Sequence, residues 1–210
     1  MVKMFEKCIN LKSLDLSGFK TLRVENFDSM FNGLHISYLL DLTNFNLVKA
    51  IRLDSMLSNC QSLINLDIST SINLSHFNTG RVYSFIDMFE SFTSLEKINL
   101  NNLDISQERY MRNIFRNCHK LSYIDFIVFK SGNNLLFGID SMFNNCTSLS
   151  MINLSKLNLT QFESDYPDFY SGDLFIGVKS NGELIYTEVL IPTKIKNAFP
   201  SRLEYYYIYV

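Results

Sequence analysis

One pattern of apolar and polar positions recurs along the chain between residues 4 and 155. It reads Met-Phe-x-x-Cys-x-x-Leu-x-x-Leu-Asp-Leu-Ser, and its six copies begin at Met4, Met30, Met56, Met88, Ile114 and Met142. Successive starts are 26, 26, 32, 26 and 28 residues apart. A unit this short cannot bury its apolar positions alone, so the repetition predicts a stack in which each copy covers its neighbours.

Each copy predicts a short strand and a short helical turn. The segment Leu14-Asp15-Leu16 alternates apolar and polar positions, as a strand with one buried face does. The equivalent segments are Leu40-Asp41-Leu42, Ile98-Asn99-Leu100, Ile124-Asp125-Phe126 and Ile152-Asn153-Leu154. A polar pair such as Asp28-Ser29 precedes the Met in several copies and suits the cap of a helical turn that begins there.

The period and the Leu-x-x-Leu-x-Leu core of each copy indicate a leucine-rich repeat protein. We predict an α/β solenoid over residues 1–160, a right-handed, horseshoe-like stack of six repeats of about 26 residues with parallel strands and short helices. Residues 161–210 leave the period, and Asp173–Leu190 reads as a hairpin around a Lys-Ser-Asn-Gly turn. This segment is predicted to be a β-rich C-terminal cap that hides the last apolar face.

The third copy is longer than the others and contains two candidate strands, Leu66–Ser69 and Ile72–Ser75. Counting forward from Met56 favours the first strand, and counting backward from Met88 favours the second. The extra residues therefore lie between Asp67 and Leu74. A surface bulge is the simpler interpretation, but loops that interrupt a regular scaffold often carry function. The candidate binding residues of this inserted loop are Ser69, Thr70, Ser71, Ile72 and Asn73.

The first copy starts at Met4 with no preceding cap in the given sequence, so we expect its apolar positions to form an unshielded edge. These positions are Phe5, Cys8, Leu11, Leu14 and Leu16. Two hypotheses follow. The chain is a C-terminal fragment of a longer array, or the edge is covered by a second copy through self-association.

Equivalent positions of successive copies should form columns through the stack. The column after the Met holds Phe5, Phe31, Leu57, Phe89, Phe115 and Phe143, which predicts a core spine. A second column holds Cys8, Leu34, Cys60, Phe92, Cys118 and Cys146, and so contains all four cysteines. Because Leu and Phe replace Cys there, we interpret the cysteines as buried free thiols. The alternatives are a disulfide between Cys118 and Cys146 and a metal site.

No arrangement of residues predicts catalysis. His35 and His119 lie three copies apart, and the sequence contains no recognisable Ser-His-Asp or Cys-His arrangement, paired inward carboxylates or glycine-rich phosphate loop. We therefore expect neither an enzyme nor a cofactor nor a bound metal. The net charge of −2 argues against a nucleic-acid interface, and no apolar run predicts insertion into a membrane.

The candidate binding residues occupy the middle of each predicted strand, where side chains should point outward. This column holds Asp15, Asp41, Asp67, Asn99, Asp125 and Asn153, and Lys97 and Tyr123 flank it. One interpretation is a solvated polar face along which Asn amides bridge neighbouring copies. The other is a recognition surface for a basic protein segment, a glycan or a cation, since repeat proteins use their extended surfaces in this way.

The repeats resemble those of the BspA-like leucine-rich repeat family, whose units read approximately MF-x-x-C-x-x-L-x-x-LDLS-x-F-x-T. Leu16–Thr21 (LSGFKT) and Leu74–Thr79 (LSHFNT) match even the trailing Phe and Thr. The second and fourth copies depart from the pattern, with Leu34 and Phe92 in the Cys position. The resemblance covers Met4 to about Thr160. It implies a leucine-rich solenoid and, for many members, a surface-exposed protein that adheres to host or neighbouring-cell molecules.

Together these patterns predict a non-enzymatic binding module that recognises a protein or a glycan through the outward strand face and the inserted loop. The alternative is a structural spacer within a longer array, without specific recognition. The given sequence holds no signal peptide or transmembrane segment. The expected location is therefore the cell surface or the extracellular space by resemblance, and the cytoplasm otherwise.

Overall fold

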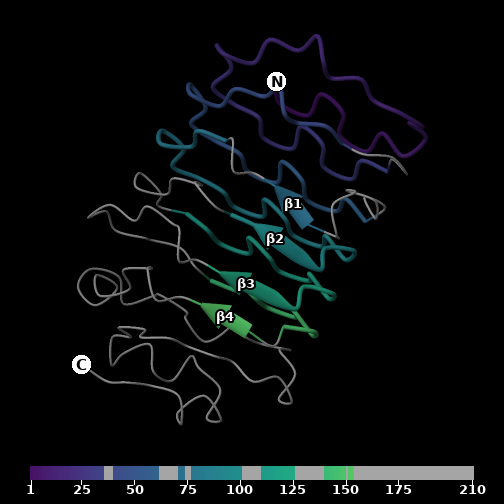
Figure 1. The fold of residues 1–210 in the computed structure, drawn as a ribbon, viewed down its shortest axis with the longest axis vertical. Helices are drawn as coiled ribbons and strands as arrows, with labels where there is room; N and C mark the ends of the chain where they lie inside the picture. Colours follow the sequence, from purple (N-terminus) through teal and green to yellow (C-terminus); the bar gives the residue numbers. More distant parts are fainter. Residues whose placement is uncertain are drawn as a thin grey trace.

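The structure is a computed structural model that describes residues 1–35, 40–61, 71–73, 77–100, 110–125, 140–149 and 151–153. These ranges hold the Met-Phe turn of each of the six copies and a sheet of four strands. Neighbouring copies lie side by side along the long axis of the view, with the N-terminus at one end (Figure 1). The predicted cap, residues 161–210, lies outside the described residues.

The sheet is parallel and takes one short strand from each of the last four copies. Its strands are β1 (Ser71–Asn73), β2 (Lys97–Asn99), β3 (Tyr123–Asp125) and β4 (Met151–Asn153), in that order (Figure 1). Ile72 pairs with Ile98 and Ile124 pairs with Ile152, so an isoleucine stands at the centre of each strand. Ile98 and Ile124 are buried, which turns this face of the sheet toward the core.

The position of β1 decides between the two candidate strands of the third copy. Asn73 in β1 pairs with Asn99 in β2, so the strand found by counting back from Met88 joins the sheet. The expectation that residues 71–73 belong to a loop is therefore corrected, because they form a strand. Residues 62–70, which include Asp67, Ser69 and Thr70, lie outside the described residues.

In the first two copies, the described residues of the expected segments Leu14–Leu16 and Leu40–Leu42 form no strand. Asp15 accepts a hydrogen bond from the Ser17 N–H at 2.9 Å, and Asp41 accepts one from the Thr43 N–H at 2.9 Å. A side chain that binds the backbone two residues further on stabilises a local turn. These turns take up N–H groups that a continuing strand would offer to its neighbour.

A regular ladder of backbone hydrogen bonds joins the Met-Phe turns of neighbouring copies. Three N–H groups at alternate residues of one copy donate to three carbonyls of the next, at N···O distances between 2.7 and 3.0 Å. At the first junction, Lys3, Phe5 and Lys7 donate to Asp28, Met30 and Asn32. The donors at the later junctions are Ser29, Phe31 and Gly33; Ser55, Leu57 and Asn59; Asp87, Phe89 and Ser91; and Asn113, Phe115 and Asn117. The copies are thus held together by their main chains, as the strands of a parallel sheet are.

Left-handed backbone makes this ladder possible and takes the place of the expected helix. In each copy, the residue before the Met position and the third residue after it have φ between 53° and 65°. These residues are Lys3, Lys7, Ser29, Gly33, Ser55, Asn59, Asp87, Ser91, Asn113, Asn117, Ser141 and Asn145. A right-handed helix cannot continue through a left-handed residue. The helical turn predicted to begin at each Met is therefore wrong for the described copies, in which this segment is a chain of turns.

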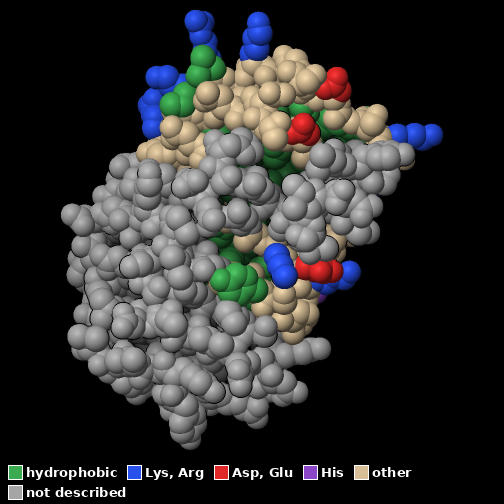
Figure 2. Space-filling view, in the orientation of Figure 1, with side chains coloured by type: hydrophobic (Ala, Val, Ile, Leu, Met, Phe, Trp, Pro, Cys, Tyr) green, Lys and Arg blue, Asp and Glu red, His purple; other side chains and the backbone are tan. Residues whose placement is uncertain are grey.

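The first copy forms one end of the row of copies (Figure 1). Phe5, Cys8, Leu11 and Leu14 are half-buried there, as expected for an edge, whereas Leu16 is buried. The large hydrophobic side chains exposed in this copy are Val2, Met4, Ile9 and Leu22. Figure 2 shows hydrophobic and basic side chains together at this end of the molecule.

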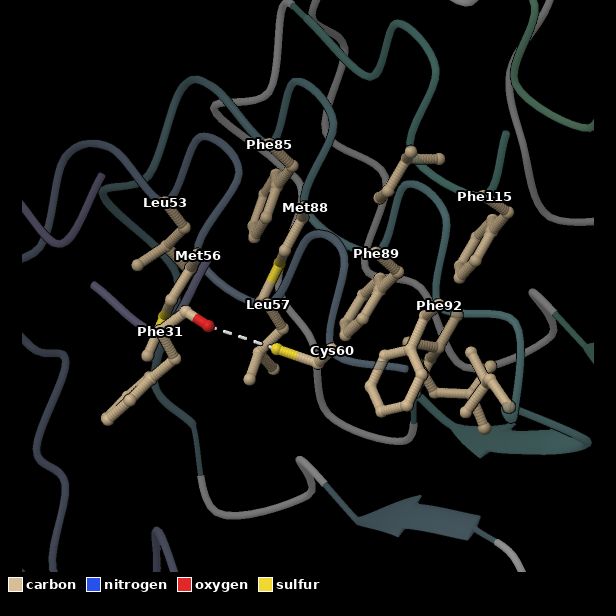
Figure 3. Close-up of a cluster of buried hydrophobic side chains, with 14 of the residues drawn as sticks. Phe31, Leu53, Met56, Leu57, Cys60, Phe85, Met88, Phe89, Phe92 and Phe115 are labelled. Carbon is tan, nitrogen blue, oxygen red and sulfur yellow. Dashed lines mark hydrogen bonds between the residues drawn. The ribbon is translucent and has the colours of Figure 1, made fainter. Parts of the chain in front are cut away.

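A column of phenylalanine rings runs through the core, as the sequence predicts. The rings of Phe89 and Phe115 stack with centroids 5.4 Å apart, and those of Phe115 and Phe143 lie 6.0 Å apart, with interplanar angles of 3° and 2°. Phe5 and Phe31 stack in the same way at 5.6 Å. In Figure 3, Leu57 occupies the place between Phe31 and Phe89. The backbone ladder sets this spacing, because the ring-bearing residue is the central donor at each junction.

We predict that shortening a ring in this column destabilises the chain in proportion to the volume lost. Phe115→Ala removes a side chain that is fully buried between two stacked rings and should cost about 3–5 kcal/mol of unfolding free energy. Phe115→Leu should cost about 1 kcal/mol, because Leu57 already fills the equivalent position in the third copy. Urea denaturation followed by circular dichroism measures both. Equal losses for the two variants would contradict the column.

Candidate functional site

The parallel register aligns the candidate binding residues of neighbouring copies on one face of the sheet. Lys97 in β2 pairs with Ser71 in β1 and with Tyr123 in β3, and Tyr123 pairs with Met151 in β4. Partners in adjacent strands lie about 4.8 Å apart and share one face. The Lys97 side chain is exposed and that of Tyr123 is half-buried, and both stand on the face opposite the buried isoleucines.

The Asp and Asn positions form a second row of paired residues, two residues further along each strand. Asn73 pairs with Asn99, and Asp125 pairs with Asn153. Three of the predicted column residues, Asn99, Asp125 and Asn153, therefore stand in one row. Asn73 takes the place predicted for Asp67, because β1 uses the later of the two candidate strands.

Asp15 and Asp41 have a local structural role in addition to being exposed. The Ser17 hydroxyl and N–H stabilise the ionised Asp15 carboxylate and lower its pKa. Asp41 accepts bonds from both the N–H and the hydroxyl of Thr43, at 2.9 and 2.7 Å. In these two copies the Asp-x-Ser/Thr sequence serves the turn that follows it. The structure thus groups Lys97 and Tyr123 but gives Asp15 and Asp41 a capping function.

Asparagine amides do bridge neighbouring copies, but they do so at the Met-Phe turns. Asn117 Nδ2 lies 3.3 Å from Ser91 Oγ, and Asn145 Nδ2 donates to Asn117 Oδ1 at 3.0 Å. Asn113 Nδ2 donates to Asp87 Oδ1 at 2.9 Å. These residues have left-handed backbone, a conformation that Asn and Asp tolerate better than most residues. Bridging of copies by Asn amides, which we expected along the strand face, is therefore observed at the Met-Phe turns.

A charged cluster that the sequence analysis did not identify joins the second, third and fourth copies. Arg52 Nη2 lies 2.6 Å from Asp54 Oδ2 and 3.2 Å from Asp28 Oδ2. The Ser84 hydroxyl and the Ile86 N–H donate to Asp54 Oδ1 at 2.5 and 3.0 Å. The sequence does contain a signal for this cluster. Asp28 and Asp54 each stand two residues before the Met of a copy, and Arg52 stands two residues before Asp54.

The cluster balances two carboxylates that are mostly buried. Burial and the neighbouring charge of Asp54 raise the pKa of Asp28, while Arg52 acts against this rise. The hydrogen bond to Asp54 raises the pKa of Arg52, so the guanidinium stays charged. The Asp54 N–H also donates to Asp28 Oδ1 at 3.0 Å. The ion pairs therefore hold adjacent copies together and offset a like-charge repulsion.

Arg52 belongs to a second row of parallel backbone contacts, away from the four-stranded sheet. Isolated bridges join Asn26 to Arg52, Arg52 to Ser84 and Ser84 to Tyr110. Tyr83 and Tyr110 are the large exposed hydrophobic residues of the described chain outside the first copy. The row therefore combines the charged Arg52 with exposed tyrosines.

The thiols of three cysteines are buried and donate to the main chain of the preceding copy. Sγ of Cys60 lies 3.1 Å from the Phe31 carbonyl oxygen (Figure 3). Cys118 and Cys146 repeat the contact with the Phe89 and Phe115 carbonyls at 3.1 and 3.0 Å. All four cysteines are free, which agrees with the interpretation as free thiols and not with the Cys118–Cys146 disulfide. Burial raises the pKa of Cys60 and Cys146 to about 12 and that of Cys118 well above its ordinary value.

Other candidate chemistry is limited in the described part of the chain. His119 Nδ1 lies 3.0 Å from the Asn145 carbonyl oxygen, a contact between the fifth and sixth copies. Over the described ranges, no group of three or more His, Cys, Asp or Glu side chains is placed to hold a metal ion. The described ranges also contain no helix whose length and apolar character would allow it to cross a membrane.

Comparison with known proteins identifies one family. The sequence profile of the family described as "Mycoplasma protein of unknown function, DUF285" matches residues 1–71 and 41–157, so the two overlapping matches span 1–157 of the 210 residues. No curated protein and no solved structure matches the chain.

We predict that iodoacetamide distinguishes Cys8 from the other three cysteines. A rise of a thiol pKa from 9.0 to about 12 lowers the thiolate fraction at neutral pH about a thousandfold. Cys8 is half-buried, so it should be alkylated first, whereas Cys60, Cys118 and Cys146 should react at the rate of unfolding. Peptide mass spectrometry over time measures each site. Rapid labelling of Cys118 in the folded chain would contradict its burial.

The same thiols give the stability a dependence on alkaline pH. Because their pKa values are raised in the fold, the folded chain keeps these protons at a pH where the unfolded chain loses them. The contribution of these thiols to stability is complete below the pKa that they have in the unfolded chain. Above about pH 9, the free energy of unfolding should fall by up to about 1.4 kcal/mol per pH unit for each thiol. Cys60→Val removes one of these thiols. The fall in unfolding free energy per pH unit, measured by urea titrations at several pH values, should therefore become smaller by the contribution of one thiol.

We also predict that Arg52→Met destabilises the chain in a pH-dependent way. Removing the guanidinium leaves Asp28 and Asp54 facing each other and should cost about 1–2 kcal/mol at neutral pH, a value reduced by the partial exposure of Arg52. Because the pKa of Asp28 is raised in the fold, acidification protonates Asp28 and should shrink this loss. Thermal unfolding at pH 7 and pH 4 measures the difference. Arg81→Met, at an exposed position, is the control and should show no such relief.

Proposed function

The chain belongs to the family described as Mycoplasma protein of unknown function, DUF285, and we propose that it is a non-enzymatic binding module of this family. In this proposal its copies are leucine-rich repeats of the BspA-like type that form a solenoid. The ligand is a protein or a glycan at a cell surface or outside the cell. The binding surface is the exposed face of β2 and β3, centred on Lys97 and Tyr123.

Two features support a solenoid of leucine-rich repeats. The strands of the last four copies are parallel and follow one another in sequence order, and the Met-Phe turns repeat one hydrogen-bond pattern across every described junction. Equivalent positions of the repeated sequence therefore stand next to each other, as the periodicity requires. Each added copy would lengthen the same surfaces without changing their pattern.

The pairing of Lys97 with Tyr123 is the observation that carries the binding proposal. Backbone bonds and the buried Ile98 and Ile124 hold the strands, and Lys97 and Tyr123 stand on the opposite face of the sheet. Tyrosine offers a rigid ring for stacking at a low entropic cost, and its hydroxyl can form a hydrogen bond. The adjacent lysine adds three donors and a positive charge. Together they suit a sugar or an acidic protein segment.

One observation favours the alternative, a structural spacer, for the first two copies. The carboxylates of Asp15 and Asp41 cap their own turns, so this stretch of the predicted column serves local structure. The binding surface is therefore proposed for the later copies, where the strands form. A spacer function for the whole chain would leave the face of β2 and β3 without a ligand.

The proposal predicts that changes on this face reduce ligand affinity without unfolding the chain. The purified chain is first tested against a glycan array and against proteins of a cell-surface extract. The affinity for any ligand found is then measured by surface plasmon resonance. Tyr123→Ala and Lys97→Glu should each weaken binding about 10-fold, which is the loss of about 1.4 kcal/mol expected for an interface hot spot.

Matched controls separate the face from general effects on charge and aromatic content. Tyr83→Ala and Lys49→Glu change exposed residues away from β2 and β3 and should leave the affinity within about twofold. The melting temperature of every variant is compared with that of the parent chain. Equal losses for the face and control variants, or the absence of any ligand, would favour the spacer.

A further inference from the structure

Three β-turns in the first three copies repeat one geometry and carry a basic residue at the same position. The turns span residues 21–24, 47–50 and 79–82, and each is closed by a backbone hydrogen bond of 2.8 Å between its fourth and first residues. Their third residues are Arg23, Lys49 and Arg81, and all three are exposed. We name these turns the basic ridge and define it by the three cations and Leu22.

Hydrogen bonds between copies hold the turns of the basic ridge next to one another. The Thr21 hydroxyl donates to the Asn46 carbonyl at 3.1 Å and accepts the Asn46 N–H at 2.7 Å. Just after the turns, the Ile51 N–H donates to the Glu25 carbonyl at 2.8 Å, and the Tyr83 N–H donates to the Ile51 carbonyl at 3.1 Å. These last three residues each follow a cation of the ridge by two positions. The cations therefore stand on neighbouring stretches of main chain, about 4.8 Å apart.

The fold itself does not use the three positive charges. The residue after each cation packs inward, since Ala50 and Val82 are buried and Val24 is half-buried against the core. Within the described part of the chain, the cations themselves form no ion pair. Like charges at neighbouring positions repel each other and oppose folding. Their repetition in three copies, as Arg or Lys, therefore points to a ligand of opposite charge.

The basic ridge is a positive region of a negatively charged chain. Residues 19–25, 45–51 and 77–83 hold one acidic residue, Glu25, and four basic residues, which gives +3. The basic residues are Lys20, Arg23, Lys49 and Arg81. The remaining residues must then carry −5, because the whole chain carries −2. Such a separation of charge produces a local positive potential that attracts an anionic partner.

Leu22 adds an apolar group beside these charges. It is 55% exposed and occupies the second position of the first turn, next to Arg23. The equivalent residues are Val48, which is half-buried, and Gly80. A protruding apolar side chain among lysine and arginine suits the surface of an anionic membrane, where apolar groups enter the interface and cations contact the headgroups.

The linear form of the basic ridge favours such a surface over a short acidic peptide. Specific binding of a single carboxylate or phosphate depends on donors held in a fixed geometry. The cations of the ridge instead end long side chains on exposed turns, with no ion-pair partner among the described residues to fix them. Attraction to membrane headgroups needs no fixed register, because each cation near the surface contributes separately.

We propose that the basic ridge docks the chain onto an anionic phospholipid surface, with Arg23, Lys49 and Arg81 against the headgroups and Leu22 inserted between them. The contact is peripheral and consists of side chains at the tips of turns. It goes beyond the ligand binding proposed for β2 and β3, which uses other residues in later copies, so either proposal can fail without the other.

Binding of the full chain to vesicles is the first test. Vesicles of phosphatidylglycerol and phosphatidylcholine in equal parts are the probe, and vesicles of phosphatidylcholine alone are the control. Co-sedimentation should show saturable binding to the anionic vesicles and none to the neutral vesicles at the same lipid concentration. Because salt screens exposed charges, raising the ionic strength from about 0.05 M to about 0.5 M should weaken binding at least 10-fold.

Matched variants test which cations are responsible. Arg23→Gln, Lys49→Gln and Arg81→Gln combined should weaken binding to the anionic vesicles about 100-fold, or about fivefold for each cation. The control variant combines Lys12→Gln, Arg112→Gln and Lys120→Gln, which removes three exposed cations of other segments. It has the same net charge as the ridge variant and should lose less than about fivefold. Melting temperatures show whether both variants are folded, and equal losses of binding would overturn the proposal.

A fluorescent reporter at Leu22 gives a readout in a chain that keeps its charges. The chain contains no tryptophan, so Leu22→Trp introduces a single indole at the tip of the first turn. Anionic vesicles should shift its emission to shorter wavelength, and lipids brominated on their acyl chains should quench it. Ile9→Trp, at an exposed apolar position of a Met-Phe turn, is the matched control and should show neither effect.

The results that would overturn the proposal are distinct. One is the absence of binding to anionic vesicles, and another is an unchanged emission of the reporter at position 22 when vesicles bind. The rival ligand, an acidic polypeptide, is tested with polyglutamate. Binding of polyglutamate that is lost in the ridge variant, without binding of vesicles, would assign the ridge to such a polypeptide and overturn the proposal as well.

Discussion

The backbone ladder between Met-Phe turns is the constraint on which the rest of the described structure depends. Each turn needs two left-handed residues, four positions apart, so that three alternate N–H groups point toward the next copy. The ladder fixes the distance between copies, and this distance brings the phenylalanine rings to a stacking separation of 5.4–6.0 Å. Outside the first copy, the left-handed positions hold only Gly, Ser, Asn or Asp, small residues that fit this conformation and, as Asn, bridge the copies.

The cysteine of the repeated pattern has two roles that depend on the same geometry. Its volume fills the core, which explains why Leu34 and Phe92 can replace it. Its thiol also donates to the Phe carbonyl of the preceding copy, at 3.0–3.1 Å in three copies. That carbonyl already accepts an N–H from its own turn, as Phe89 does from Phe92, so the thiol adds a weak second bond. Leu34 and Phe92 therefore lack the weak thiol hydrogen bond but keep the larger contribution, which is the filling of the core.

The sequence predicts those features that depend on periodicity and fails where one side chain competes with the pattern. Counting residues places Phe115 in the core and identifies Ile72–Ser75 as a candidate strand of the third copy. The helical turn is missed because polar residues before Met resemble helix caps, while left-handed φ at positions such as Ser29 and Asn117 leaves no trace in hydrophobic spacing. The capping role of Asp41 and the ion pairs of Arg52 depend on contacts whose geometry the repeat pattern does not encode.

The ladder between the turns also has a direction, and it is separate from the strands of the sheet. At every described junction the bonds between Met-Phe turns run from donors in one copy to acceptors in the next, so the two sides of a turn differ in chemistry even though the copies are alike. Lys97 and Tyr123 stand on the strands, outside the Met-Phe turns, so changes of their side chains leave the donors and acceptors of the ladder in place.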